Sequence, residues 1–141
     1  MKCEYKMENE LSANKIVYKD LSYKVVGICF WTHSELGGYL HEKYYQRGVA
    51  ALLKKEKIAF EKEISFEMVL SGEGIGKSVL DFVIDRKIAL ELKATPSLHR
   101  NDFRQLRNYL RTANLKLGIL VNFHGPKLKF HRILNSGYQP N

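Results

Sequence analysis

The feature that most constrains the fold is a pair of short runs of alternating polarity, residues 79–84 and 88–93. Alternate side chains of a strand point to opposite faces of a sheet, so the pattern predicts a β-hairpin. A two-residue loop would set Asp81 opposite Leu92, among aliphatic side chains. A three-residue loop, residues 85–87, or an equivalent bulge, pairs Asp81 with Glu91 instead, and this is the register we expect.

This register places two carboxylates side by side, with Lys93 two residues beyond on the same face. Like charges this close cost free energy unless a cation lies between them, and a divalent metal meets that need. The competing interpretation is a solvated face, the commoner meaning of acids and lysines at alternate strand positions. The apolar neighbours Val79, Val83 and Ala89 favour a covered site.

The charge balance points to a polyanionic partner. The sequence has 23 Lys+Arg and 15 Asp+Glu, a net charge of +8 in 141 residues. We expect nucleic acid rather than a membrane, because no basic amphipathic anchor stands out. Two cysteines, Cys3 and Cys29, cannot build a disulfide framework, which fits the cytoplasm. The longest apolar run, residues 25–31, is too short to cross a bilayer, and residues 1–10 lack the apolar core of a signal peptide.

The length and pattern predict one domain, residues 20–134, between a flexible N-terminal arm, residues 1–19, and a C-terminal tail, residues 135–141. We expect helices over about 20–36, 39–57 and 101–112, and strands over 63–70, 79–84, 88–93, 115–123 and 127–133. This order predicts an α/β fold with a mixed central sheet flanked by helices. The expected packing positions of the first two helices are Val25, Val26, Cys29, Phe30, Trp31, Thr32, Leu40, Tyr44, Ala51 and Leu52.

Residues 71–78, SGEGIGKS, superficially suggest a phosphate-binding loop. The spacing excludes it, because the position that needs the first glycine holds Ser71. A strand also follows, where a phosphate loop requires a helix. We interpret the segment as a glycine-rich hairpin connection.

Two helices carry further candidate residues. Glu42 lies in the first turn of the second helix, where an acid is ordinary dipole electrostatics but could also complete the site as a third carboxylate. In the third helix Gln105 and Tyr109 share one face. The interleaved arginines are either a solvated surface or phosphate contacts, and they are Arg104, Arg107 and Arg111.

Taken together, several spaced motifs resemble one known family. Asp81 followed by Glu91-x-Lys93 on a hairpin, after a helix that bears an acid, resembles the PD-(D/E)XK nuclease superfamily. The chain from about residue 20 to 123 looks like the GxxExxY family within it. The remaining motifs of that resemblance are His33-x-x-Leu36-Gly37, Glu42-x-x-Tyr45, Gln105-x-x-x-Tyr109-Leu110, Leu115 to Gly118 and Asn122-Phe123. One departure is that Tyr39 occupies the position of the family's glycine, although Gly37 and Gly38 precede it.

The resemblance implies a restriction-endonuclease-like core with Asp81 and Glu91 as Mg²⁺ or Mn²⁺ ligands, together with the Leu92 carbonyl. It implies Glu42 as a further acid and Lys93 as the group that aligns or activates the attacking water. Gln105 and Tyr109 are similar to the QxxxY motif of RecB-like and lambda-exonuclease-like members, which helps to hold DNA and the site. The residues expected to contact nucleic acid are Tyr45, Arg104, Arg107 and Arg111.

Two functions are therefore weighed. The first is a Mg²⁺-dependent nuclease that hydrolyses phosphodiester bonds, in DNA rather than RNA. The alternative is a non-catalytic nucleic-acid-binding or accessory module that keeps the fold, and a protein-interaction scaffold is a more remote third reading. A homodimer or a partner protein is left open by the sequence.

Overall fold

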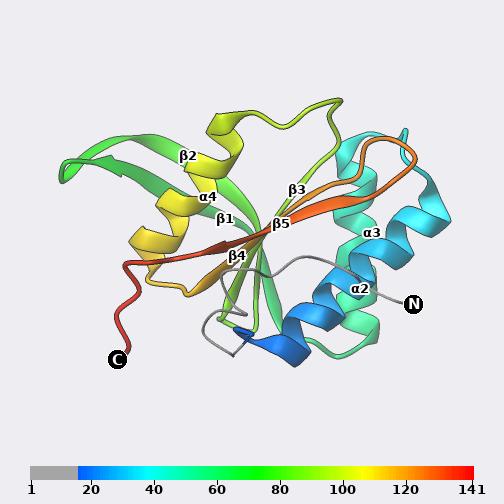
Figure 1. The fold of residues 1–141 in the computed structure, drawn as a ribbon, viewed down its shortest axis with the longest axis horizontal. Coiled ribbons are helices and arrows are strands. Elements are labelled where there is room, and N and C mark those ends of the chain that lie inside the picture. The colour runs from blue at the N-terminus through cyan, green and yellow to red at the C-terminus, as the bar shows by residue number, and fades with distance from the viewer. Residues whose placement is uncertain (1–15) are drawn as a thin grey trace.

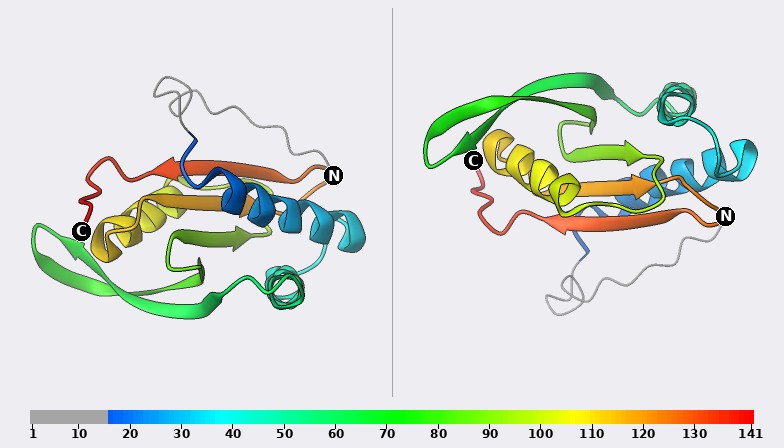
Figure 2. Two further views of the ribbon diagram at one scale, coloured as in Figure 1. Left: turned by 90° about the horizontal axis from the view of Figure 1, so that it is seen from below. Right: turned by 90° about the horizontal axis from the view of Figure 1, so that it is seen from above.

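The structure of this chain is a computed structural model that describes residues 16–141, so most of the predicted N-terminal arm lies outside the described part. A five-stranded sheet is flanked by helices on both faces (Figures 1 and 2). The helices are α2 (Lys19–Leu36), α3 (Glu42–Lys55) and α4 (Arg100–Ala113). The strands are β1 (Phe60–Leu70), β2 (Glu73–Ile84), β3 (Ile88–Lys93), β4 (Leu117–Asn122) and β5 (Lys129–Leu134).

The sheet is mixed, as the sequence predicted. Its strands lie in the order β1-β2-β3-β4-β5, with β3 and β4 parallel and the other neighbours antiparallel. Helix α4 joins the two parallel strands, because parallel neighbours need a crossover connection. Helices α2 and α3 pack on one face of the sheet and α4 on the other. None of the helices between residues 16 and 141 is long and apolar enough to cross a membrane.

Helix α2 buries most of the expected face but differs at its ends and at one aromatic. Val25, Val26 and Cys29 are buried as predicted. Trp31 is 48% exposed, so its assignment to the core was wrong. The helix ends at Gly37 as predicted, with φ of 79°, but it begins after Tyr18, which has a left-handed backbone, rather than at Asp20 or Ser22.

Of the packing positions expected on α3, only Leu52 packs against the core, where it is partly buried. The buried positions are Tyr45, Val49, Ala50 and Leu53. Tyr44 and Ala51 are exposed instead, and Leu40 precedes the helix. The helix also begins at Glu42 rather than near Tyr39.

The glycine-rich segment forms the turn and the first half of strand β2. The turn residues Ser71 and Gly72 have φ of 49° and 81°, and β2 begins at the next residue. The predicted hairpin is therefore correct, but Gly74 and Gly76 belong to a strand rather than to a loop. The β1–β2 hairpin extends beyond the rest of the sheet, on the side of α4 (Figure 1).

A close backbone contact fixes the turn between α2 and α3. Gly125, in the connection between β4 and β5, donates its N–H to the carbonyl of Gly38 at 2.8 Å. A Cβ on Gly38 would overlap the carbonyl oxygen of Gly125, so only glycine fits there. The neighbouring Tyr39 is 75% exposed and needs no such space.

We expect Gly38→Ala to lower the free energy of unfolding by about 1–3 kcal/mol, because backbone must move to admit the methyl group. Gly27→Ala is the matched control: it lies inside α2 with nothing within 4 Å of an added Cβ. That change should raise the free energy of unfolding by about 0.5–1 kcal/mol. Urea unfolding followed by circular dichroism measures both, and equal effects of the two substitutions would contradict the contact.

Candidate active site

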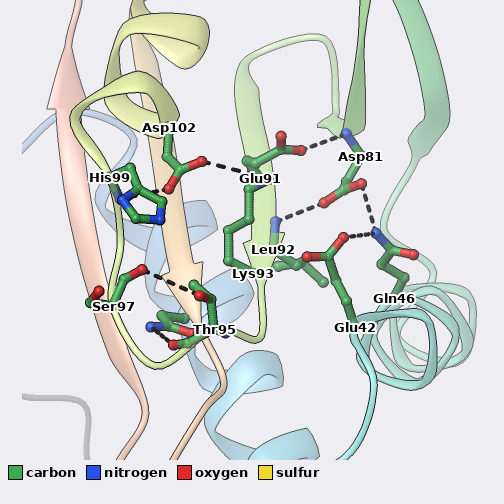
Figure 3. A network of polar contacts seen from close by, with 11 residues as sticks. Glu42, Gln46, Asp81, Glu91, Leu92, Lys93, Thr95, Ser97, His99 and Asp102 are labelled. Atoms are coloured by element: carbon green, nitrogen blue, oxygen red, sulfur yellow. Dashed lines mark hydrogen bonds and ion pairs between the residues drawn. The ribbon is translucent and has the colours of Figure 1, made fainter.

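The candidate site lies where strands β2 and β3 separate. Their ladder pairs Ile84 with Ile88 and Phe82 with Leu90, which confirms the three-residue loop, and it stops there. One residue further, the two strands exchange side-chain hydrogen bonds instead (Figure 3). The N–H of Asp81 donates to Glu91 Oε1 at 3.1 Å, and the N–H of Leu92 donates to Asp81 Oδ2 at 2.8 Å.

A change of face in β2 accompanies this separation. Leu80 packs in the cluster under α4, whereas Phe82 packs in the cluster under α2 and α3. Strict alternation along residues 79–84 would put these two residues on the same face, so this part of the strand pattern was wrong. The register of β2 with β1 skips Asp81 and its opposite residue Glu63, which has φ of 55°. This local irregularity redirects the strand at the acid.

Val79 was also expected to help cover the site. It is 52% exposed, whereas its expected companions Val83 and Ala89 are buried. The change of face at Asp81 accounts for the difference.

Helix α3 contributes Glu42, which is linked to Asp81 by the side-chain amide of Gln46. Gln46 Nε2 donates to Asp81 Oδ1 at 2.9 Å and to Glu42 Oε2 at 3.2 Å. Glu42 and Gln46 lie one turn apart on the helix, so both side chains can face Asp81 of β2. Figure 3 shows the three side chains side by side.

Lys93 does not contact the two strand acids directly. Its ammonium group lies 3.8 Å from Asp102 Oδ1, and the lysine side chain is 27% exposed. Asp102 is held by the start of α4, because its Oδ2 accepts the N–H of His99 at 2.8 Å in a capping box. The cap thus fixes the carboxylate that orients the lysine.

Burial and mutual repulsion disfavour the charged forms of these acids. Burial, then the negative charge of Asp81, raises the pKa of Glu91 to about 9. Burial also raises the pKa of Asp81 and that of Glu42, although the charge of Lys93 opposes the shift at each. Without a cation, the Asp81–Glu91 pair therefore holds a proton near neutral pH.

Comparison with known proteins identifies the family. A sequence profile of the PD-(D/E)XK nuclease superfamily matches residues 19–133. The chain belongs to this superfamily. No curated protein matches the chain significantly.

A solved structure supports the fold. The crystal structure of SSO0001 aligns with a TM-score of 0.53 and 24% identity, over 67% of this chain and 50% of that chain. This similarity concerns the fold alone. The present chain spans about half the length of SSO0001. The restriction-endonuclease-like fold expected from the sequence is thereby confirmed.

PD-(D/E)XK nucleases typically use divalent metals, so we ask whether the acids of this site could hold one. Within residues 16–141, no group of three or more acidic, histidine or cysteine side chains is arranged to hold a metal ion. Two of the acids, Asp81 and Glu91, do interact. Mg²⁺ commonly takes one or two carboxylates and keeps several waters, so the chemistry of this pair suits it. A cation between the two carboxylates would offset their mutual repulsion, which favours its binding.

Tyr45 lies elsewhere than expected for a nucleic-acid contact. Its side chain is fully buried and stacks on Phe123 with ring centroids 4.4 Å apart. Its hydroxyl donates to the carbonyl of Gly37 at 2.5 Å and accepts the N–H of Leu40 at 3.1 Å. The expectation is corrected: Tyr45 anchors the turn before α3 and so positions Glu42.

The far end of β3 is fixed by Asn122. Its side chain is 6% exposed and exchanges two hydrogen bonds with the backbone of Thr95, at 2.9 and 3.2 Å. Phe123 also donates its N–H to the carbonyl of Lys93 at 2.8 Å. The motif Asn122-Phe123 therefore holds the backbone at the end of β3, at Lys93 and Thr95.

The two motif residues on α4, Gln105 and Tyr109, are both at least partly covered. Tyr109 is 7% exposed and packs edge-on against Phe66 of β1, at 4.9 Å between ring centroids. Gln105 is partly buried. In residues 16–141 no hydrogen bond or ion pair joins either side chain to the strand acids or to Lys93. The three predicted phosphate-binding residues of this helix are all exposed, and they are Arg104, Arg107 and Arg111.

Two residues of the site were not singled out from the sequence. Gln46 had a usable signal, because it follows Glu42 by four residues and so shares its helical face. Asp102 had one too, since an acid three residues after a capping residue indicates a capping box. The true N-cap is His99, an uncommon capping residue, which hid the pattern.

We expect Glu91→Gln to stabilise the metal-free protein at alkaline pH. The folded pKa of Glu91 lies above its unfolded value of 4.5, so its contribution to stability is complete below pH 4.5 and is lost as the pH rises towards about 9. The neutral amide removes this loss. At pH 9 in EDTA the variant should melt about 3–8 °C above the unaltered protein.

The control is Glu73→Gln at the exposed start of β2, which should leave the melting profile unchanged across the same pH range. Differential scanning fluorimetry from pH 5 to 9 measures all three proteins. A parallel pH dependence in Glu91→Gln and the unaltered protein would show that the buried pair does not titrate as described.

Proposed function

We propose that this protein is a Mg²⁺-dependent nuclease that hydrolyses phosphodiester bonds in DNA. The observation that carries the proposal is the pairing of the partly buried Asp81 with the buried Glu91, within a chain of the PD-(D/E)XK nuclease superfamily. A basic lysine lies two residues along the same strand. Buried acids with raised pKa values at a strand opening are typical of functional sites rather than of a solvated surface.

The proposed metal ligands are Asp81, Glu91 and the carbonyl of Leu92, with Glu42 as a further acid. A bound Mg²⁺ or Mn²⁺ would neutralise charge on the phosphoryl oxygens and make a water molecule more acidic. Gln46 contributes by holding Asp81 and Glu42 at fixed positions through one amide nitrogen. This arrangement keeps both carboxylates near the strand opening without a direct contact between them.

Lys93 is proposed to align the attacking water and to stabilise negative charge on the phosphate. Its position depends on Asp102, which lies 3.8 Å from the ammonium group. Asp102 is therefore proposed as a positioning residue. Because the cap of α4 fixes that acid, the position of Lys93 depends on the start of the helix.

The nucleic acid is proposed to be DNA, and the net charge of +8 supports a polyanionic substrate. Gln105 and Tyr109 remain proposed contributors to holding it. Action in the cytoplasm, and a homodimer or partner protein, also remain proposals. The narrower GxxExxY assignment is retained as a proposal on the motifs given above.

A second candidate is a non-catalytic nucleic-acid-binding module with the same fold. One observation favours it: in residues 16–141 no third acid joins the pair in a metal-binding arrangement. Such a protein would bind DNA in a salt-dependent way but would not cut it.

Lys93→Ala separates these functions. If the protein is a nuclease, this change should slow cleavage of linear, nicked or single-stranded DNA by about 10²-fold or more in Mg²⁺ or Mn²⁺, because it removes charge stabilisation in the transition state. Lys87→Ala is the matched control, an exposed lysine in the loop of the same hairpin, and it should cut at the normal rate. A gel assay with end-labelled DNA measures the rates.

Equal cleavage by Lys93→Ala and the unaltered protein would refute the proposed role of the lysine. Binding by the unaltered protein with no cleavage under any of these conditions would favour the non-catalytic module. Cleavage that persists in EDTA would exclude the proposed use of a divalent metal.

A further inference from the structure

A groove opens beside the candidate site, on the side away from α4. It has a volume of about 520 Å³ and lies between helix α3 and the β1–β2 hairpin. Asp81 and Gln46 are among its lining residues, so the strand acid borders the groove. Ligand-binding clefts commonly measure about 300–1,000 Å³.

Cations line both walls of this groove. Lys43 and Arg47, one turn apart on α3, form one wall, and Lys62 of β1 lies on the other. All three side chains are exposed. The described residues include no salt bridge that neutralises any of them. Glu63 is the one other acid besides Asp81 that lines this groove.

Two arginines of α4, Arg107 and Arg111, are placed less well for the same task. Helix α4 starts near Lys93 with Asp102 in its first turn, and it rises about 1.5 Å per residue. Arg107 and Arg111 therefore lie roughly 7 and 13 Å further along the axis than Asp102. They line a separate hollow of about 50 Å³ beside Leu134 and Asn135.

We infer that Lys43, Arg47 and Lys62 bind backbone phosphates of the nucleic-acid strand that is cut, and so lead that strand over Asp81. This inference rests on the proposed nuclease function and adds the path of the substrate. Cations on two facing walls can contact phosphates from both sides, whereas a single row on a helix contacts one side. Phosphate contacts position a strand without reading its sequence, so this groove should bind without sequence preference.

The test compares two variants that lose the same charge. Lys43→Ala/Arg47→Ala and Arg107→Ala/Arg111→Ala each lower the net charge from +8 to +6. Binding of a fluorescent single-stranded oligonucleotide is measured by anisotropy in EDTA, between 50 and 200 mM salt, so that no strand is cut. The groove variant should bind about 10–100-fold more weakly. For this variant, the slope of the logarithm of the binding constant against the logarithm of the salt concentration should be smaller in magnitude by about 1.4.

The α4 variant should bind within about twofold of the unaltered protein. Lys62→Ala, on the opposite wall, should weaken binding on its own and lower the salt slope by about 0.7. All the substituted side chains are exposed, and melting temperatures check that every variant is folded.

Equal losses in the two double variants would overturn the groove assignment in favour of diffuse attraction by net charge. Absence of binding by the unaltered protein would overturn it as well. Cleavage in Mg²⁺ separates this failure from that of the proposed function, since a protein that cuts DNA but binds it equally through both surfaces is still a nuclease.

Discussion

The site depends on one exchange of hydrogen bonds between strands β2 and β3. Where the regular ladder ends, Asp81 accepts the N–H of Leu92, and Glu91 accepts the N–H of Asp81. Each carboxylate thus satisfies a backbone donor that the separating strands would otherwise leave unpaired. The same bonds hold two acids together in a nearly buried place. The hydrogen bonds that replace the regular ladder are therefore the same ones that place the two acids. The change of face at Asp81 allows its carboxylate to take part in them.

The neighbouring elements hold the other side chains of the site in position around these two acids. Tyr45 and the Gly38–Gly125 contact fix the turn before α3, which sets Glu42 and Gln46 against Asp81. On the other side, the cap of α4 holds Asp102, and this acid holds Lys93. Two acids this close are unfavourable when both are charged, so the pair lowers the free energy of unfolding of the metal-free protein. Such a cost is understandable if a cation binds there.

The sequence predicted a mixed sheet from the order of its elements. It also predicted the three-residue loop and the neighbouring acids, because alternation and register are local properties of two short strands. It failed where tertiary packing decides. Leu80 and Phe82 face different helices because of an irregularity opposite Glu63 that alternation cannot reveal. Tyr45 belongs to a motif expected at the substrate but is buried, since a motif does not distinguish contact with a ligand from support of the site. Lys93 pairs with Asp102, which lies nine residues later and is positioned by the start of α4.

Titration of the protein with Mn²⁺, followed by electron paramagnetic resonance of the free ion, tests the central claim most directly. If Asp81 and Glu91 form a cation site, the protein should bind Mn²⁺ through them, and Asp81→Asn should weaken that binding about tenfold or more, because it removes a charged ligand. Asp85→Asn, in the exposed loop of the same hairpin, should bind as the unaltered protein does. Equal Mn²⁺ affinity in all three proteins, or none in the unaltered one, would contradict the account.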